Sequence, residues 1–245
     1  MAVERIALTL SIGGGIAGFG PAPNIAASLF LPPDGGRPRA LAFCLHGGGY
    51  SRRYFDIEAL GQAGYSMARY MADRGVAVAT IDCLGGGDSS RAESANAIVW
   101  QTLAPAHHAA LLHLRSCLAA GAVLPMLPAV PTVGIGHSLG GMLFALHQAT
   151  ERSFDKLAAL GWSNLGLNLP PEALVPIPDA TGEYFRSSPA LRRQFHLNDV
   201  PADILESEAE QENLGVAASL AAQAADSAAA AEISGTKDGS QEMWK

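Results

Sequence analysis

The sequence predicts an α/β fold in which a mostly parallel β-sheet is covered by helices on both faces. Short apolar runs alternate along the chain with longer segments of helical spacing, and several of these runs end in glycine-rich loops. The 245 residues suffice for one domain with a sizeable core. Apolar residues make up 49% of the chain and charged residues 16%, which excludes a wholly disordered protein.

Six segments have the composition of β-strands. The first two are joined by a Gly/Pro-rich loop too short for a crossover helix, so we expect them to pair antiparallel. The later ones are separated by helical segments, which predicts parallel pairing. In chain order, the predicted strands are residues 4–11, 25–31, 40–45, 76–81, 133–135 and 157–162.

Three helices are predicted between these strands. The first spans residues 57–74, because its apolar residues lie on one face and Gly75 follows at a typical helix end. The second spans residues 92–120, with Pro105 expected to break it or to begin a new helix. The third starts after the strand at 133–135 and runs to about residue 150.

The composition changes after residue 164. Residues 165–230 are first rich in proline and aromatic residues, then in alanine and acidic residues, and they contain no buried-strand run. We interpret this segment as a helical cap over the carboxyl edge of the sheet, inserted into a single domain of residues 1–245. Residues 235–245 are predicted to form a tail.

Charge and cysteine usage exclude several classes of partner. The net charge of −7 and the absence of a basic cluster argue against nucleic acids and anionic membranes. The start of the chain lacks the positive charge of a secretory signal, and the three cysteines form no disulfide framework, so we expect a cytoplasmic protein. No histidine or cysteine spacing suits a metal, and none of the glycines forms a dinucleotide fingerprint, so no metal or other cofactor is expected.

The chemistry centres on Gly136-His137-Ser138-Leu139-Gly140. A short β-branched run precedes this G-x-S-x-G pattern and a helix-spaced segment follows it, which is the strand–turn–helix context that the pattern requires. The sharp turn favours glycine on both sides of Ser138 and exposes the serine hydroxyl. The positive end of the following helix points at the same place.

Two further glycine loops follow predicted strands, at His46-Gly47-Gly48-Gly49 and at 82–90. With the serine turn, these loops resemble the oxyanion loop, the D-x-x-G-x-G-x-S loop and the nucleophile elbow of the α/β-hydrolase family. The three motifs occur in that family's order, and the resemblance covers residues 1–165. It implies a sheet of the α/β-hydrolase type and the chemistry of serine esterases and lipases.

The resemblance implies a role for each motif residue. Ser138 would be the nucleophile that forms an acyl-enzyme. The backbone amides of Leu139 and of Gly48 (or its neighbour Gly47) would form the oxyanion hole. The remaining motif residues would support the backbone geometry of these loops and take no part in proton transfer: His46, His137 and Asp82.

The family also places an acid and then a histidine after the serine. Asp238, within the loop-like segment 235–239, occupies the position of the acid, but no histidine follows it. The candidate base is His196, in the predicted cap. We therefore expect the chain to lack the family's last strand and helix. The sixth strand would then be an exposed edge through which two copies associate.

Two functions remain open at this level. The first is a serine hydrolase acting on small to medium carboxylic esters with an apolar group, whose incomplete triad predicts weak or no activity for the chain as it stands. The alternative is a non-catalytic (pseudo-hydrolase or truncated) α/β-hydrolase-like protein that binds a small apolar ligand or a protein partner. Ser138 favours the first hypothesis, and the missing histidine favours the second.

Overall fold

The computed structural model describes residues 3–57, 64–93, 97–122 and 129–162. Six strands form one sheet in the order β1-β2-β4-β3-β5-β6. The strands are β1 (Glu4–Ser11), β2 (Asn24–Leu31), β3 (Ala40–Leu45), β4 (Val76–Ile81), β5 (Thr132–His137) and β6 (Lys156–Leu160). The helices are α1 (Met67–Ala72), α2 (Trp100–Ala119) and α3 (Leu139–Glu151), with two 3₁₀ turns, η1 (Pro33–Gly35) and η2 (Arg52–Phe55).

The antiparallel pairing of the first two strands and the parallel pairing of the last four match the prediction, whereas the pairing of β2 with β4 was not predicted. β1 pairs antiparallel with β2, and β2 pairs antiparallel with β4. β4, β3, β5 and β6 are mutually parallel. The last residues of these four strands therefore lie at one edge of the sheet, and the glycine loops that follow β3, β4 and β5 meet there.

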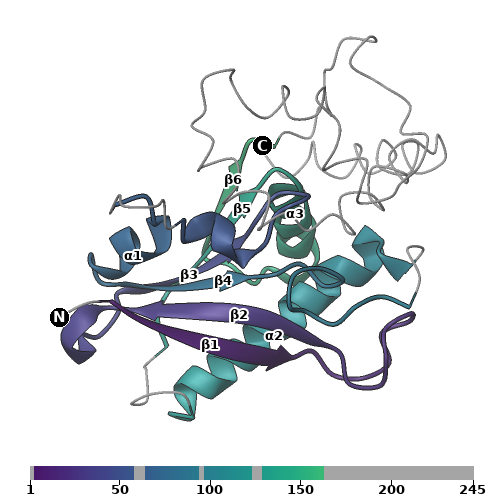
Figure 1. Ribbon diagram of the computed structural model, residues 1–245, viewed down its shortest axis with the longest axis horizontal. Helices are drawn as coiled ribbons and strands as arrows, with labels where there is room; N and C mark the ends of the chain where they lie inside the picture. Colours follow the sequence, from purple (N-terminus) through teal and green to yellow (C-terminus); the bar gives the residue numbers. More distant parts are fainter. Residues whose placement is uncertain (1–2, 58–63, 94–96, 123–128, 163–245) are drawn as a thin grey trace, which may run out of the picture.

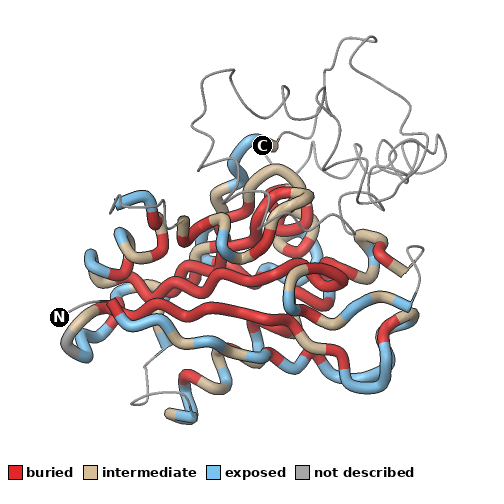
Figure 2. Tube along the Cα trace, in the orientation of Figure 1, coloured by how far each residue is buried: buried red, intermediate tan, exposed pale blue. Residues whose placement is uncertain are grey.

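Helices cover both faces of the sheet, as expected: α1 lies on one face and α2 and α3 lie on the other (Figure 1). The alternation of side chains along β3 divides the core accordingly. Leu41, Phe43 and Leu45 pack in the cluster with α2 and α3, while Ala42 and Cys44 pack in the cluster with α1. Both faces of the central strands are thus buried (Figure 2), which explains why β3 and β4 are continuous apolar runs.

The first predicted helix is wrong in extent. Within the described part of the predicted range 57–74, only α1 is an α-helix, and residues 58–63 lie outside the described residues. Its start is set by Ser66, whose Oγ accepts a hydrogen bond from the amide of Arg69. Asp56, which is buried, accepts hydrogen bonds from both of these side chains and ties α1 to the end of η2.

Pro105 lies inside α2 and does not divide it, contrary to the expected break. Proline lacks an N–H group, so the carbonyl of Gln101 loses its partner one turn earlier. Both residues are exposed, and this carbonyl lies on the solvent side of the helix, where the loss costs least. The cap predicted at 165–230 and the tail at 235–245 lie outside the described residues.

Candidate active site

Ser138 occupies a strained turn between β5 and α3. Its backbone has φ 50° and ψ −115°, a conformation that residues with a side chain rarely adopt. The Ser138 amide donates a hydrogen bond to the carbonyl of Leu160 at the end of β6 (2.7 Å). Its carbonyl accepts one from the amide of Met142 in the first turn of α3 (3.0 Å). The strained conformation is therefore held from both sides.

The two glycines of the motif allow this turn to pack closely. A Cβ atom at Gly136 would lie 2.3 Å from the carbonyl oxygen of Gly140, and one at Gly140 would lie 2.2 Å from that of Leu45. Both contacts involve backbone atoms, so no side-chain rearrangement would relieve them. These close approaches are the geometry expected of a nucleophile elbow.

The loop after β3 lies beside this serine. Leu45 pairs in register with Gly136, so residues 46–49 leave the sheet next to the elbow. A Cβ atom at Gly47 would lie 3.4 Å from the Cβ atom of Ser138. The sequence-predicted Gly47, Ser138 and Leu139, the first residue of α3, are thus brought together, and Gly48 follows directly in the same loop.

Both ring nitrogens of His46 make hydrogen bonds to the backbone. Nδ1 lies 2.7 Å from the carbonyl oxygen of Gly47, and Nε2 accepts a hydrogen bond from the amide of Cys83 (3.2 Å). Acceptance at Nε2 requires the proton on Nδ1, which then donates to Gly47. Burial lowers the pKa of His46, which favours this neutral form. His46 therefore orients the first peptide of the glycine loop.

His137 packs against an aromatic ring from η2. Its imidazole is stacked on Tyr54 with ring centroids 5.1 Å apart and an interplanar angle of 11°. A Cβ atom at Gly47 would lie 3.0 Å from Nδ1 of His137, so this ring also limits the space around the glycine loop. Burial lowers the pKa of His137. The stack thus links η2, the glycine loop and the serine turn.

Asp82, directly after β4, is fully buried and acts as an acceptor for several donors. Its carboxylate binds the amide of Arg52 (2.6 Å), the guanidinium of Arg52 and the amide of Asp88 (2.8 Å). A Cβ atom at Gly87 would lie 2.1 Å from Oδ2 of Asp82, so the loop closes tightly around the carboxylate. Arg52 did not emerge from the sequence analysis, since no spacing links it to Asp82.

Asp238 and His196 both lie outside the described residues. Within the described part of the chain, no hydrogen bond joins a histidine to Oγ of Ser138. His107 accepts a hydrogen bond from the amide of Leu84, and burial lowers its pKa to about 3.

A second group of polar side chains lies between α2 and α3. Nδ1 of His108 lies 3.0 Å from Nε2 of His147 and 2.6 Å from Oγ of Ser153. His147 is fully buried against the rings of Phe144 and Phe154. His147 therefore packs in the interface between α2 and α3. Among the described residues, no group of three or more His, Cys, Asp or Glu side chains is arranged to hold a metal ion.

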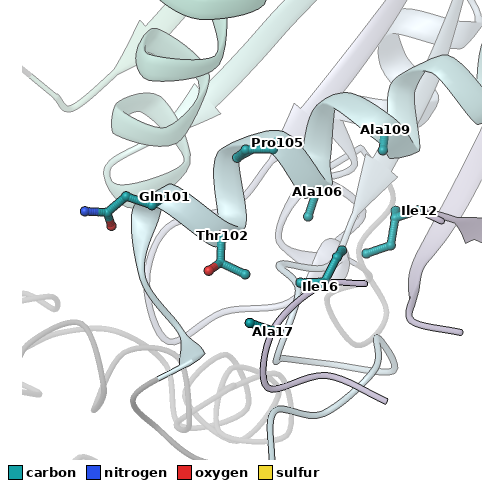
Figure 3. A pocket seen from close by; sticks show the side chains of 8 residues that line it. All are labelled: Ile12, Ile16, Ala17, Gln101, Thr102, Pro105, Ala106 and Ala109. Carbon is teal, nitrogen blue, oxygen red and sulfur yellow. The ribbon is translucent and has the colours of Figure 1, made fainter. Parts of the chain in front are cut away.

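A cavity of about 400 Å³ lies between α2 and the loop that follows β1 (Figure 3). It is lined by the loop after β1, at Ile12, Ile16 and Ala17, and by residues of the first half of α2. None of the motif residues lines it.

No helix in the described ranges has the length and apolar character needed to cross a bilayer.

The sequence model of the alpha/beta hydrolase family matches residues 42–239, which include all three glycine loops. The chain belongs to this family. No curated protein matches the amino-acid sequence at a significant level.

Solved structures of this family's fold resemble the chain at low sequence identity. The bottromycin epimerase BotH, in complex with bottromycin A2, aligns with a TM-score of 0.55 and 13% identity over 88% of this chain and 71% of its own. The peroxisomal alpha-beta-hydrolase Lpx1 from Saccharomyces cerevisiae aligns with a TM-score of 0.54 and 15% identity over 90% of this chain and 68% of its own. The chain spans 56% of a thermostable carboxyl esterase from Bacillus coagulans (TM-score 0.43, 20% identity, 85% of this chain). The first two likenesses show the fold.

Proposed function

We propose that the protein is a serine hydrolase that cleaves carboxylic esters through an acyl-enzyme formed on Ser138. The observation that carries the proposal is the backbone of Ser138, which is held at φ 50° between two glycines that tolerate no Cβ atom. A protein maintains such strain where the conformation serves a function. The turn presents a hydroxyl group beside the first amides of α3 and the glycine loop, which is the arrangement that acyl transfer requires.

The reaction would proceed in two halves. Oγ of Ser138 attacks the ester carbonyl carbon, and the resulting oxyanion accepts hydrogen bonds from the amides of Leu139 and of Gly48 (or Gly47). One such donor contributes about 3 kcal/mol to the stability of the transition state. The alcohol leaves with the proton taken from Ser138, and water then attacks the acyl-enzyme to release the acid.

Proton transfer requires a base and an acid that orients it. By its place in the family's order, Asp238 is the acid of this proposal, and His196 is the base to be tested. The supporting residues are His46, His137 and Asp82, whose contacts hold the backbone of the two catalytic loops. The substrate would be a small to medium ester with an apolar group, in keeping with the Leu, Phe and Tyr content of residues 165–230.

The alternative is a non-catalytic member of the fold that binds a small apolar ligand or a protein partner. The observation that favours it is that, in the described ranges, Ser138 Oγ has no histidine partner. An unactivated serine hydroxyl is a weak nucleophile. The two functions therefore differ in whether Ser138 reacts faster than an ordinary serine.

Intact-mass analysis after incubation with a fluorophosphonate distinguishes these functions. We expect one phosphonyl group per chain in the wild type and in Ser153→Ala, and none in Ser138→Ala. Ser153 is the control because its Oγ contacts a histidine, His108, but lies outside the serine turn. Loss of labelling in His196→Gln would identify the base. An unlabelled wild-type chain with a folded circular-dichroism spectrum would contradict the enzyme and favour the alternative.

A further inference from the structure

The segment 46–52 carries the oxyanion loop, and it is attached at both ends to the two residues that follow β4. At its start, Nε2 of His46 accepts a hydrogen bond from the backbone amide of Cys83. At its end, the amide of Arg52 donates to Oδ1 of Asp82 (2.6 Å). Residues 82 and 83 are neighbours in the chain, so one short stretch of backbone holds the glycine loop from both sides.

The side chain of Arg52 makes the second attachment much stronger than one backbone hydrogen bond. Its guanidinium donates to Oδ2 of Asp82 and to Oδ2 of Asp88 (2.7 Å), and Nε lies 3.4 Å from Oγ of Ser28. The Arg52 side chain is 12% exposed and that of Asp82 is fully buried. Asp88, in contrast, is 72% exposed, so the buried Asp82 is the partner that is shielded from water. A planar guanidinium held by a buried carboxylate restricts the position of its backbone.

The loop between these attachments has little rigidity of its own. Three successive glycines, Gly47 to Gly49, permit many backbone conformations, and Gly49 adopts φ 91°. Within the loop, the amide of Tyr50 donates to the carbonyl of Gly47 across a distance of 3.3 Å. The path of these peptides, and hence the direction of their N–H groups, therefore depends on where the two ends are held.

We propose that Arg52 is a positioning residue, which acts with Asp82 to hold the glycine loop so that its amide faces the carbonyl that Ser138 attacks. The proposal rests on the proposed ester hydrolysis for its catalytic consequence. Arg52 also places η2, whose Tyr54 stacks on His137 beside Ser138. The ion pair between Arg52 and Asp82 thus fixes the position of the oxyanion loop and that of the Tyr54 ring beside the serine turn.

Hydrogen–deuterium exchange on the full chain tests the proposed attachment without depending on catalysis. Arg52→Lys keeps the positive charge but lacks the planar guanidinium that binds two carboxylates. In this variant we expect the amides of residues 47–50 to exchange about tenfold faster, because local opening becomes easier. Arg52→Met should increase this effect. Arg53→Lys is the matched control, since Arg53 is the exposed neighbour in the same turn, and it should exchange like the wild type.

Kinetics test the catalytic consequence. We expect kcat for a short-chain p-nitrophenyl ester to fall by about tenfold to a hundredfold in Arg52→Met with KM nearly unchanged, because the misplaced donor stabilises only the transition state. Arg52→Lys should recover part of this loss. If Arg52→Met fails to fold, the kcat of Arg52→Lys relative to the wild type tests the catalytic consequence.

Failure of this inference and failure of the proposed function give different results. A wild-type chain that neither hydrolyses esters nor reacts with a fluorophosphonate contradicts the function, while the exchange rates still report on the attachment. Unchanged exchange at residues 47–50 in both folded Arg52 variants overturns the role of Arg52. So does an unchanged kcat in an active protein whose Arg52 has been replaced.

Discussion

The first turn of α3 lies directly against the end of β3: a Cβ atom at Gly140 would stand 2.2 Å from the carbonyl oxygen of Leu45. It would also stand 2.6 Å from the carbonyl oxygen of His46, the residue that begins the glycine loop. This close approach joins the helix that follows Ser138 to the strand that precedes the glycine loop.

Gly140→Ala should therefore damage both stability and reactivity. Overpacking of this kind typically lowers the free energy of unfolding by about 1–3 kcal/mol, and here the added methyl group meets backbone atoms that cannot rotate away. Urea unfolding measures the first effect and fluorophosphonate labelling the second. Gly20→Ala is the control, because no atom lies within 4 Å of its added Cβ atom. Equal stability of the two variants would contradict the close approach.

Ser138→Gly should be more stable than Ser138→Ala. Both variants lose the hydroxyl group of the proposed nucleophile, but only glycine adopts φ 50° and ψ −115° without steric cost. Strained positions of this kind cost on the order of 1–3 kcal/mol, so we expect a difference of about 1 kcal/mol in the free energy of unfolding. Chemical denaturation of the two variants measures it. An alanine variant as stable as the glycine variant would show that the turn stores no strain.

His107 should make the fold sensitive to acid. Burial lowers its pKa from 6.5 to about 3, so between these values the unfolded chain binds a proton that the folded chain excludes. The free energy of unfolding therefore falls as the pH drops below 6.5, and His107 by itself contributes a loss of about 2 kcal/mol between pH 7 and pH 5.

His107→Gln measures this contribution, because an amide oxygen in place of Nε2 accepts the hydrogen bond from Leu84 without titrating. We expect this variant to lose about 2 kcal/mol less stability between the two pH values than the wild type does. Urea unfolding at pH 7 and pH 5 provides the comparison. An identical loss in both proteins would rule out His107 as a source of the acid sensitivity.

Association through the sixth strand stays a prediction. Among the described residues, no strand pairs with the outer edge of β6, and Leu160 on this strand is 44% exposed. An unpaired apolar edge favours strand pairing between two copies, and a charged side chain there opposes it. We expect wild-type mass to rise with concentration in light scattering. Leu160→Lys should weaken this association, whereas Leu112→Lys on α2 should not.

The strands were predicted well from local sequence, because the burial of each strand determines which of its own residues are apolar. The runs at 40–45 and 76–81 are apolar throughout, since both faces of β3 and β4 are covered. The serine turn was also recognisable, because the two glycines that its geometry requires lie two positions on either side of Ser138. In both cases the physical constraint acts on residues that are adjacent or nearly adjacent in the chain.

The helices were predicted less well, because contacts from elsewhere decide their ends. The start of α1 depends on Ser66 and on its hydrogen bond to Asp56, ten residues earlier. Pro105 was expected to break α2, but it lies where the helix faces solvent and the lost hydrogen bond costs little. Helical spacing alone carries neither kind of information.

The sequence by itself determined the α/β class, the alternation of strands and helices along the chain, the three glycine loops and Ser138 as the candidate nucleophile. Backbone propensity and steric demand act within short stretches of the chain, so they can be recognised there. Only the tertiary structure revealed that Arg52 binds Asp82, thirty residues away, and that Tyr54 stacks on His137. Such contacts arise where parallel strands end at a common edge. Their partners come from different loops, and no local pattern encodes which side chains meet there.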